Sequence, residues 1–160
     1  MIKEKVLEAL AYLGFKYEEV GENTYEFSYE GTRYLYMYND NDEDFLSIVV
    51  YGVYELEDGD ELKLYKLIDK VNGTMKYCKA YRIGNSLWLS YERELFGEED
   101  FAQLISTIIL HLDSTLYYTR KAIADADKPE DTGDGETGSD TESGETDGDG
   151  IEAADPEKEQ

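Results

Sequence analysis

The large apolar side chains stop abruptly near residue 126, and this break limits how much of the chain can fold. All 15 Tyr, all five Phe and the single Trp88 lie in residues 1–126, whereas residues 127–160 contain only Ile151. Those last 34 residues also carry 14 acidic and two basic side chains. Such a segment cannot bury enough apolar surface to offset the entropy lost on ordering. We therefore predict one α+β domain over 1–126 and a disordered acidic Gly/Ser/Thr-rich tail over 127–160.

The charge balance and the scarcity of reactive side chains exclude several classes of function. The formal net charge is −23, which opposes binding to nucleic acid, where Lys and Arg supply most of the affinity. A single cysteine, Cys78, excludes an internal disulfide, and a single histidine, His111, excludes any site that needs two imidazoles. Cys78 is expected to be a buried apolar side chain, and His111 a packed or half-exposed imidazole rather than a ligand or general base. We expect no catalytic residue, no metal and no cofactor.

The first half of the chain predicts one helix followed by a β meander. Apolar residues recur at helical spacing over 2–13 and then give way to alternation typical of half-buried strands. The expected elements are a helix over 2–13 ended by Gly14, a candidate short strand at 15–20, and strands at 25–29, 33–38 and 45–56, with a turn at Glu30-Gly31 and a bulge at Gly52.

The second half predicts a helix, a hairpin and a long closing helix. These elements are a helix that starts at Asp58-Gly59-Asp60 and stops at Asn72-Gly73, strands at 75–83 and 86–95 joined by Gly84-Asn85, and a helix over 98–125 with Glu98, Glu99 and Asp100 in its first turn. The coarse order is α-β-β-β-α-β-β-α. Hairpins and amphipathic helices together favour an antiparallel sheet with helices on one face.

Tyrosines are unusually frequent in the predicted strands and include Tyr34, Tyr36 and Tyr38. One interpretation is that β-propensity and cross-strand aromatic pairing select them. The other is that an aromatic sheet face binds another chain, since Tyr is enriched at interface cores. Both interpretations stay open on the sequence alone.

The closing helix offers a second candidate contact. Its main apolar stripe should pack on the sheet, whereas Leu110 and Tyr117, seven residues apart, fall together on the opposite side. A lone exposed Leu needs no explanation. An aligned Leu and Tyr is also what a homodimer or a partner helix would use, so Leu110 and Tyr117 are candidate partner-binding residues.

One acidic segment has the beginning of a metal-binding pattern. Asp40–Asp44 begins like a calcium loop, but an EF-hand needs Gly at its sixth position and Glu at its twelfth, where this chain has Phe45 and Tyr51. A solvated loop is the better interpretation. The sequence has no signal peptide pattern and no apolar run long enough to span a membrane, so we expect a cytoplasmic protein.

The order of elements resembles the bacterial YbjN family, whose fold is similar to that of the class I type III secretion chaperones. The segments that carry the resemblance are "EALAYLGFKYEE", "YEFSYEGTRYLYMYND", "FLSIVVYGVYEL" and "LWLSYERELF", which cover about residues 1–125. They match a pattern of elements and not a signature motif. The resemblance implies a small acidic module, often dimeric, that acts through protein contacts and has no catalytic residues to transfer.

Two hypotheses for function follow. The first is a non-enzymatic interaction or regulatory module with chaperone-like binding of another polypeptide. The second is a small-molecule-binding domain or enzyme whose pocket lies between helix and sheet. Under the first hypothesis the partner is another protein chain, one with a basic segment or a second copy of this chain, and neither nucleic acid nor membrane.

Overall fold

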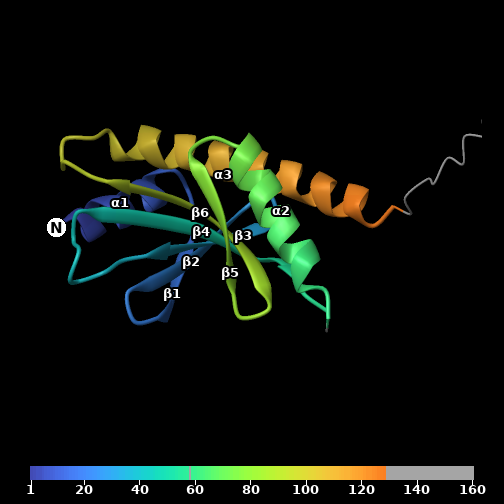
Figure 1. Ribbon diagram of the computed structural model, residues 1–160. Helices are drawn as coiled ribbons and strands as arrows, with labels where there is room; N and C mark the ends of the chain where they lie inside the picture. The colour runs from blue at the N-terminus through green and yellow to red at the C-terminus, as the bar shows by residue number, and fades with distance from the viewer. Residues whose placement is uncertain (58, 129–160) are drawn as a thin grey trace, which may run out of the picture. The chain divides into compact units, whose positions relative to one another are not determined.

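Helix α1 (Ile2–Tyr12) opens the fold and turns its apolar side inward. The computed structural model describes residues 1–57 and 59–128, and the tail expected over 127–160 lies outside them from residue 129 on. After α1 come β1 (Tyr17–Gly21), β2 (Thr24–Tyr29), β3 (Thr32–Met37), β4 (Phe45–Glu55), α2 (Glu61–Thr74), β5 (Cys78–Ile83), β6 (Ser86–Glu94) and α3 (Phe101–Ala126) (Figure 1). This confirms the α+β class and the coarse order, and the candidate strand at 15–20 is present as β1.

The six strands form one antiparallel sheet in the order β1-β2-β3-β4-β6-β5. Two of the expected turns join neighbouring strands directly. Glu30 and Gly31 both have positive φ, 47° and 80°, as the two-residue turn of a tight hairpin requires. Gly84-Asn85 likewise joins β5 to β6.

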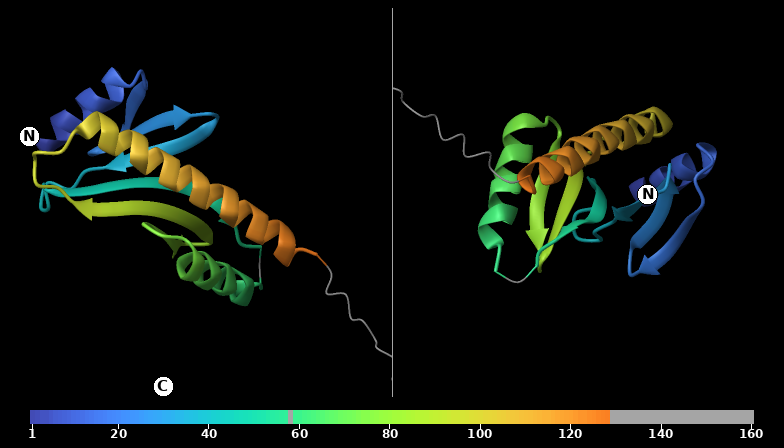
Figure 2. Two further views of the ribbon diagram at one scale, coloured as in Figure 1. Left: turned by 90° about the horizontal axis from the view of Figure 1, so that it is seen from above. Right: turned by 90° about the vertical axis from the view of Figure 1, so that its right-hand side faces the viewer.

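All three helices cover the same face of the sheet, and the core lies between them. Leu10 of α1, Leu64 of α2 and Ile108 of α3 belong to one buried cluster with Phe27 and Leu89 of the sheet. Seen from above, α3 runs diagonally across the sheet between α1 and α2 (Figure 2). Because side chains alternate along a strand, the residues between these core positions point to the opposite, uncovered face.

Two helix ends differ from the sequence prediction. Helix α2 continues through Asn72-Gly73 to Thr74, because Asn72 uses its side chain to bond to β5 and Gly73 keeps a helical backbone. Helix α3 begins at Phe101, after the three acids expected in its first turn. Asp100 is instead its N-cap and accepts a hydrogen bond from the N–H of Gln103 at 3.0 Å.

A bulge in β4 creates an opening in the helix-covered layer. Gly52 has φ +63°, and the pairing of β4 with β6 moves from Val50 opposite Leu89 to Tyr54 opposite Leu87. Residues 51–53 of β4 therefore lie opposite a single residue of β6, Trp88. The pairing of β3 with β4 also ends at Val50, so the β2–β3 turn diverges from β4 beside α3.

Candidate protein-binding surface

Leu110 and Tyr117 lie on the outward side of α3, as their spacing predicted. Their exposed fractions are 59% and 74%, while Ile105, Ile108 and Leu112 of the same helix are buried. The helix phase inferred from the sequence is thus confirmed. Whether these two residues bind a partner stays a prediction.

An apolar hollow of about 240 Å³ adjoins Leu110. Phe15 and Tyr29 form one wall, and Ser106, Ile109 and Leu110 of α3 form the other. The rings of Phe15 and Tyr29 meet edge to face, with centroids 6.1 Å apart, which fixes the shape of that wall. We call this the Leu110 hollow. Its apolar lining is suited to accept an apolar side chain from a partner protein.

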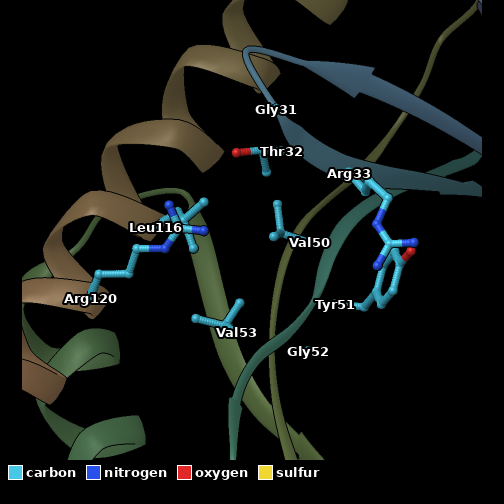
Figure 3. Close-up of a pocket in the computed structure, with 9 residues that line it drawn as sticks. All are labelled: Gly31, Thr32, Arg33, Val50, Tyr51, Gly52, Val53, Leu116 and Arg120. Carbon is cyan, nitrogen blue, oxygen red and sulfur yellow. The ribbon is translucent and has the colours of Figure 1, made fainter.

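A second hollow of about 180 Å³ lies further along α3, where the β4 bulge opens the layer (Figure 3). Arg120 of α3 extends from one side and Arg33 of β3 stands on the other, with Val50 and Val53 between them. We call this the arginine hollow. It lies between helix and sheet, where the alternative hypothesis placed a small-molecule pocket. Its lining residues include no carboxylate, imidazole or thiol that could act as a base or nucleophile.

Tyr34 lies in the core near the arginine hollow with an unsatisfied hydroxyl group. The side chain is fully buried, and its Oη has no hydrogen-bond partner among residues 1–57 and 59–128. Burial first, and then the negative charge of Asp113, raises the pKa of Tyr34 well above its usual range, while Arg120 acts in the opposite direction. The hydroxyl therefore stays protonated.

Tyr36 and Tyr38 share the covered face with Tyr34, and this corrects the hypothesis that these three phenols form an exposed docking face. Their exposed fractions are all 7% or less. Tyr34 stacks on Phe27 with ring centroids 5.3 Å apart and Tyr36 on Tyr25 at 6.0 Å, so cross-strand aromatic pairing accounts for these two. The ring of Tyr38 instead lies beneath Lys3, whose Nζ is 5.0 Å from the centroid.

A third hollow, of about 410 Å³, contains the only histidine of the chain. The ring of His111 lies between Tyr77, with centroids 4.5 Å apart, and Tyr91, at 6.1 Å. Tyr77 has φ +68°, an uncommon conformation for a residue with a side chain, and its contact with His111 helps to hold it. At the other end of this hollow, Arg93 pairs with Glu99 at 3.6 Å.

Cys78 is buried beside Thr115, and burial raises the pKa of its thiol. A protonated thiol in the core behaves as a small apolar side chain, as the sequence indicated. Within residues 1–57 and 59–128, no group of three or more His, Cys, Asp or Glu could hold a metal ion. In the same residues no helix has both the length and the apolar character of a membrane span.

Sequence comparisons give no relative: no protein-family model and no curated protein matches the chain. Solved structures do match. YbjN from E. coli, described as a candidate transcription regulator, superposes with a TM-score of 0.61 at 12% identity, covering 77% of this chain and 92% of that one. The chain has a YbjN-like fold.

Two further structures resemble this YbjN-like fold. One comes from the heterodimeric ExoU–SpcU complex of the type III secretion system of Pseudomonas aeruginosa, with a TM-score of 0.50, 17% identity, and 74% of this chain and 94% of that chain covered. The other is an uncharacterised protein from Methanothermobacter thermautotrophicus, with a TM-score of 0.51, 16% identity, and 79% and 96% covered. The predicted likeness to type III secretion chaperones is therefore confirmed at the level of the fold.

The sequence did not indicate Phe15, Tyr29, Arg33 or Arg120 as site residues. Each is unremarkable in its local pattern. Only the packing of the fold brings Phe15 and Tyr29 beside Leu110, and Arg33 into the same hollow as Arg120. The predicted tight turn at Glu30-Gly31 was the one local signal, because it indicates a hairpin whose end can lie close to a helix.

Proposed function

We propose that the chain is a non-enzymatic module that binds another polypeptide at the outward side of α3. The observation that carries this proposal is the exposed Leu110 at the edge of an apolar hollow lined by Phe15, Tyr29 and Ile109. Leu110 can insert into a partner, and the adjacent hollow can accept an apolar side chain of that partner. Tyr117 extends the same side of α3 and is of a residue type that often dominates interface energetics.

The structural neighbours support a protein-binding role. One of them comes from a heterodimeric complex of two proteins. Because a similar fold at this identity does not transfer a function, the proposal depends on the surface of this chain and not on that complex.

The charge of the chain favours a partner with a basic segment. At a net charge of −23, the chain attracts cationic groups over a range set by the ionic strength. Association with such a partner should therefore slow as salt is added. Contacts at the Leu110 hollow should depend on salt much less, because they bury apolar surface.

The test compares two leucines of similar exposure. Leu110→Glu places a charge at the proposed contact, whereas Leu62→Glu places one on α2, where Leu62 is 65% exposed. Each tagged variant, as the full chain, is used for affinity purification from the native host, and bound proteins are identified by mass spectrometry. We expect Leu110→Glu, alone and with Tyr117→Ser, to lose partners that wild type and Leu62→Glu retain.

Thermal unfolding and light scattering complete the experiment. Both glutamate variants should unfold at the wild-type temperature, because neither leucine is buried. If Leu110→Glu folds normally and keeps every specific partner, the proposed surface is wrong. Light scattering tests whether the partner is a second copy: a wild-type dimer that Leu110→Glu converts to a monomer identifies one, and a monomer at high concentration excludes it.

A further inference from the structure

The described residues contain four arginines, and they fall into two pairs with different surroundings. Arg82 pairs with Glu61 at 3.1 Å and Arg93 pairs with Glu99 at 3.6 Å. Among residues 1–57 and 59–128, Arg33 and Arg120 have no carboxylate within 4 Å. In a chain with 38 acidic and 15 basic residues, an arginine without an acidic partner is unexpected. These two arginines line the same hollow.

The arginine hollow offers the groups that recognise an oxyanion. Guanidinium groups match the geometry of carboxylate and phosphate oxygens and bind them through paired hydrogen bonds. Figure 3 shows Arg120 directed over the hollow from α3 and the hydroxyl of Thr32 directed toward it from the β2–β3 turn. The guanidinium group of Arg33 lies over the ring of Tyr51 at the edge of the hollow, with its Cζ 5.1 Å from the centroid, so Arg120 is the arginine that is directed over the hollow.

The backbone around the hollow is also accessible. Gly31 and Gly52 both line it, and neither has a side chain that would cover the main chain. Residues 51–53 lie in the bulge, where the regular pairing of β4 with β6 is interrupted. Bulges of this kind are frequent near binding sites.

The surroundings of the hollow disfavour free anions. Glu30 precedes Gly31 in the turn, Asp113 lies on α3 close enough to influence Tyr34, and the carboxylate of Glu55 lies near Gly52. The whole chain is negative as well. An isolated anion should consequently bind weakly, whereas an oxyanion attached to a polypeptide that makes other contacts would be held in place.

The arginine hollow and the Leu110 hollow lie one after the other along α3. Tyr29 lines the Leu110 hollow and Gly31 lines the arginine hollow, so the same β2–β3 turn forms a wall of both. Leu110 and Arg120 are ten residues apart on α3, which is roughly 15 Å at 1.5 Å per residue. An extended segment covers that distance in about four or five residues.

We infer that the arginine hollow binds an oxyanion, a carboxylate or a phosphoryl group, carried by the partner polypeptide about four or five residues from the apolar side chain that enters the Leu110 hollow. This inference rests on the proposed function, and it adds the chemistry of the partner's second anchor. The partner can carry a basic segment elsewhere in its chain and still present one acidic or phosphorylated residue to the arginine hollow.

The first experiment tests the hollow without any partner. Isotope-labelled full-length chain is titrated with inorganic phosphate, and separately with acetate, at constant ionic strength. We expect saturable shifts of the amide signals of Gly31, Thr32 and Gly52, with a dissociation constant on the order of millimolar. Arg120→Gln should weaken phosphate binding at least tenfold, and Lys121→Gln, which removes an adjacent cation that does not line the hollow, should leave it unchanged.

The second experiment uses synthetic peptides in which one apolar residue is followed, at each spacing from two to seven, by Asp, Glu, phosphoserine or Ser. We expect the acidic or phosphorylated peptides to bind wild type best at spacings of four or five, and Arg120→Gln to abolish that preference. A preference for Asp and Glu identifies a carboxylate, and a preference for phosphoserine alone identifies a phosphoryl group.

The outcomes separate the two proposals. If peptides bind through their apolar residue, lose binding with Leu110→Glu, and show no effect of Arg120→Gln, the proposed function holds and the inference is wrong. If no peptide binds and partner capture does not depend on Leu110, the proposed function fails and the inference fails with it. Phosphate shifts that are unaffected by Arg120→Gln, or spread evenly over the lysines, would also overturn the inference.

Discussion

The side-chain amide of Asn72 forms two hydrogen bonds with the backbone of Ala80. Nδ2 donates to the carbonyl oxygen at 2.9 Å, and the N–H of Ala80 donates to Oδ1 at 2.7 Å. Asn72 belongs to α2, and Ala80 lies in β5, a strand at the edge of the sheet that pairs only with β6. The amide thus takes the place of a neighbouring strand, and it covers one position of an edge that could otherwise pair with another chain.

Asn72→Ala should destabilise the fold. It removes both bonds and leaves two backbone groups of a partly buried strand without protein partners, which costs about 1–3 kcal/mol. A fall of several degrees in the thermal midpoint is expected. Asn72→Asp keeps the hydrogen-bond acceptor and loses the donor, so its thermal midpoint should lie between those of wild type and Asn72→Ala. An unchanged midpoint for Asn72→Ala would show that this contact contributes nothing to stability.

Gly73→Ala should stabilise the chain. Gly73 lies within α2, has a helical backbone, and an added Cβ there would meet no atom within 4 Å. Alanine is favoured over glycine in a helix by roughly 0.5–1 kcal/mol. Urea unfolding should show a higher midpoint with an unchanged slope. A lower midpoint would mean that Gly73 ends the helix in solution, as the sequence pattern predicted. Gly31→Ala, at φ +80°, serves as the opposite control and should be destabilising.

Tyr34→Phe should be neutral or slightly stabilising. The change removes a buried hydroxyl that has no hydrogen-bond partner in the described part of the chain, and it keeps the ring that stacks on Phe27. Tyr34→Leu, which loses the stacking as well, should cost about 1–3 kcal/mol. Comparing the two unfolding free energies separates the hydroxyl from the ring. A marked loss of stability in Tyr34→Phe would reveal a partner for the hydroxyl, such as a bound water.

Glu99 should make stability depend on pH. The N–H of Phe96 first, and then the N–H of Gly97 and the charge of Arg93, lower the pKa of the Glu99 carboxyl below its usual value. A lowered pKa in the folded state contributes stability above the unfolded value of about 4.3, and this contribution is lost as the pH falls through the folded value. Glu99→Gln should therefore lower the thermal midpoint at pH 7.

The difference between wild type and Glu99→Gln should shrink as the pH falls below about 4, since the carboxyl is then protonated in both states. Glu98→Gln is the matched control, because Glu98 is exposed and its side chain forms no hydrogen bond or ion pair with the described residues. A pH-independent difference between Glu99→Gln and wild type would mean that the charge of Glu99 is not what stabilises the loop before α3.

The sequence predicted the helix faces well and the strand faces poorly. In α3 the exposed Leu110 and Tyr117 stand out because their neighbours at three and four residues are mostly polar or face the core. In β3, apolar side chains occupy both faces, so Tyr34 and Leu35 could each have faced the helices. Alternation identifies the buried side only when the other side is polar.

The candidate site could be predicted only in part. Leu110 follows from helical periodicity, whereas Arg33 and Arg120 are far apart in the sequence and neither lies in a motif. The sequence predicted the bulge at Gly52, but it did not predict the hollow that the bulge opens beside α3. The divergence of the β2–β3 turn from β4 depends on how two hairpins and a helix pack, which no local pattern records.

The position of β6 between β4 and β5 has a consequence for synthesis on the ribosome. Strands β2, β3 and β4 each pair with the strand that precedes them in the sequence, so these pairs can form as soon as the strands emerge. The centre of the sheet cannot, because Phe45 pairs with Glu94 and Glu55 with Ser86. One edge of the apolar strand β4 therefore stays open until α2, β5 and β6 have been translated. During that interval the unpaired edge of β4 is exposed to wrong pairing, which is the hazard that chaperones counter.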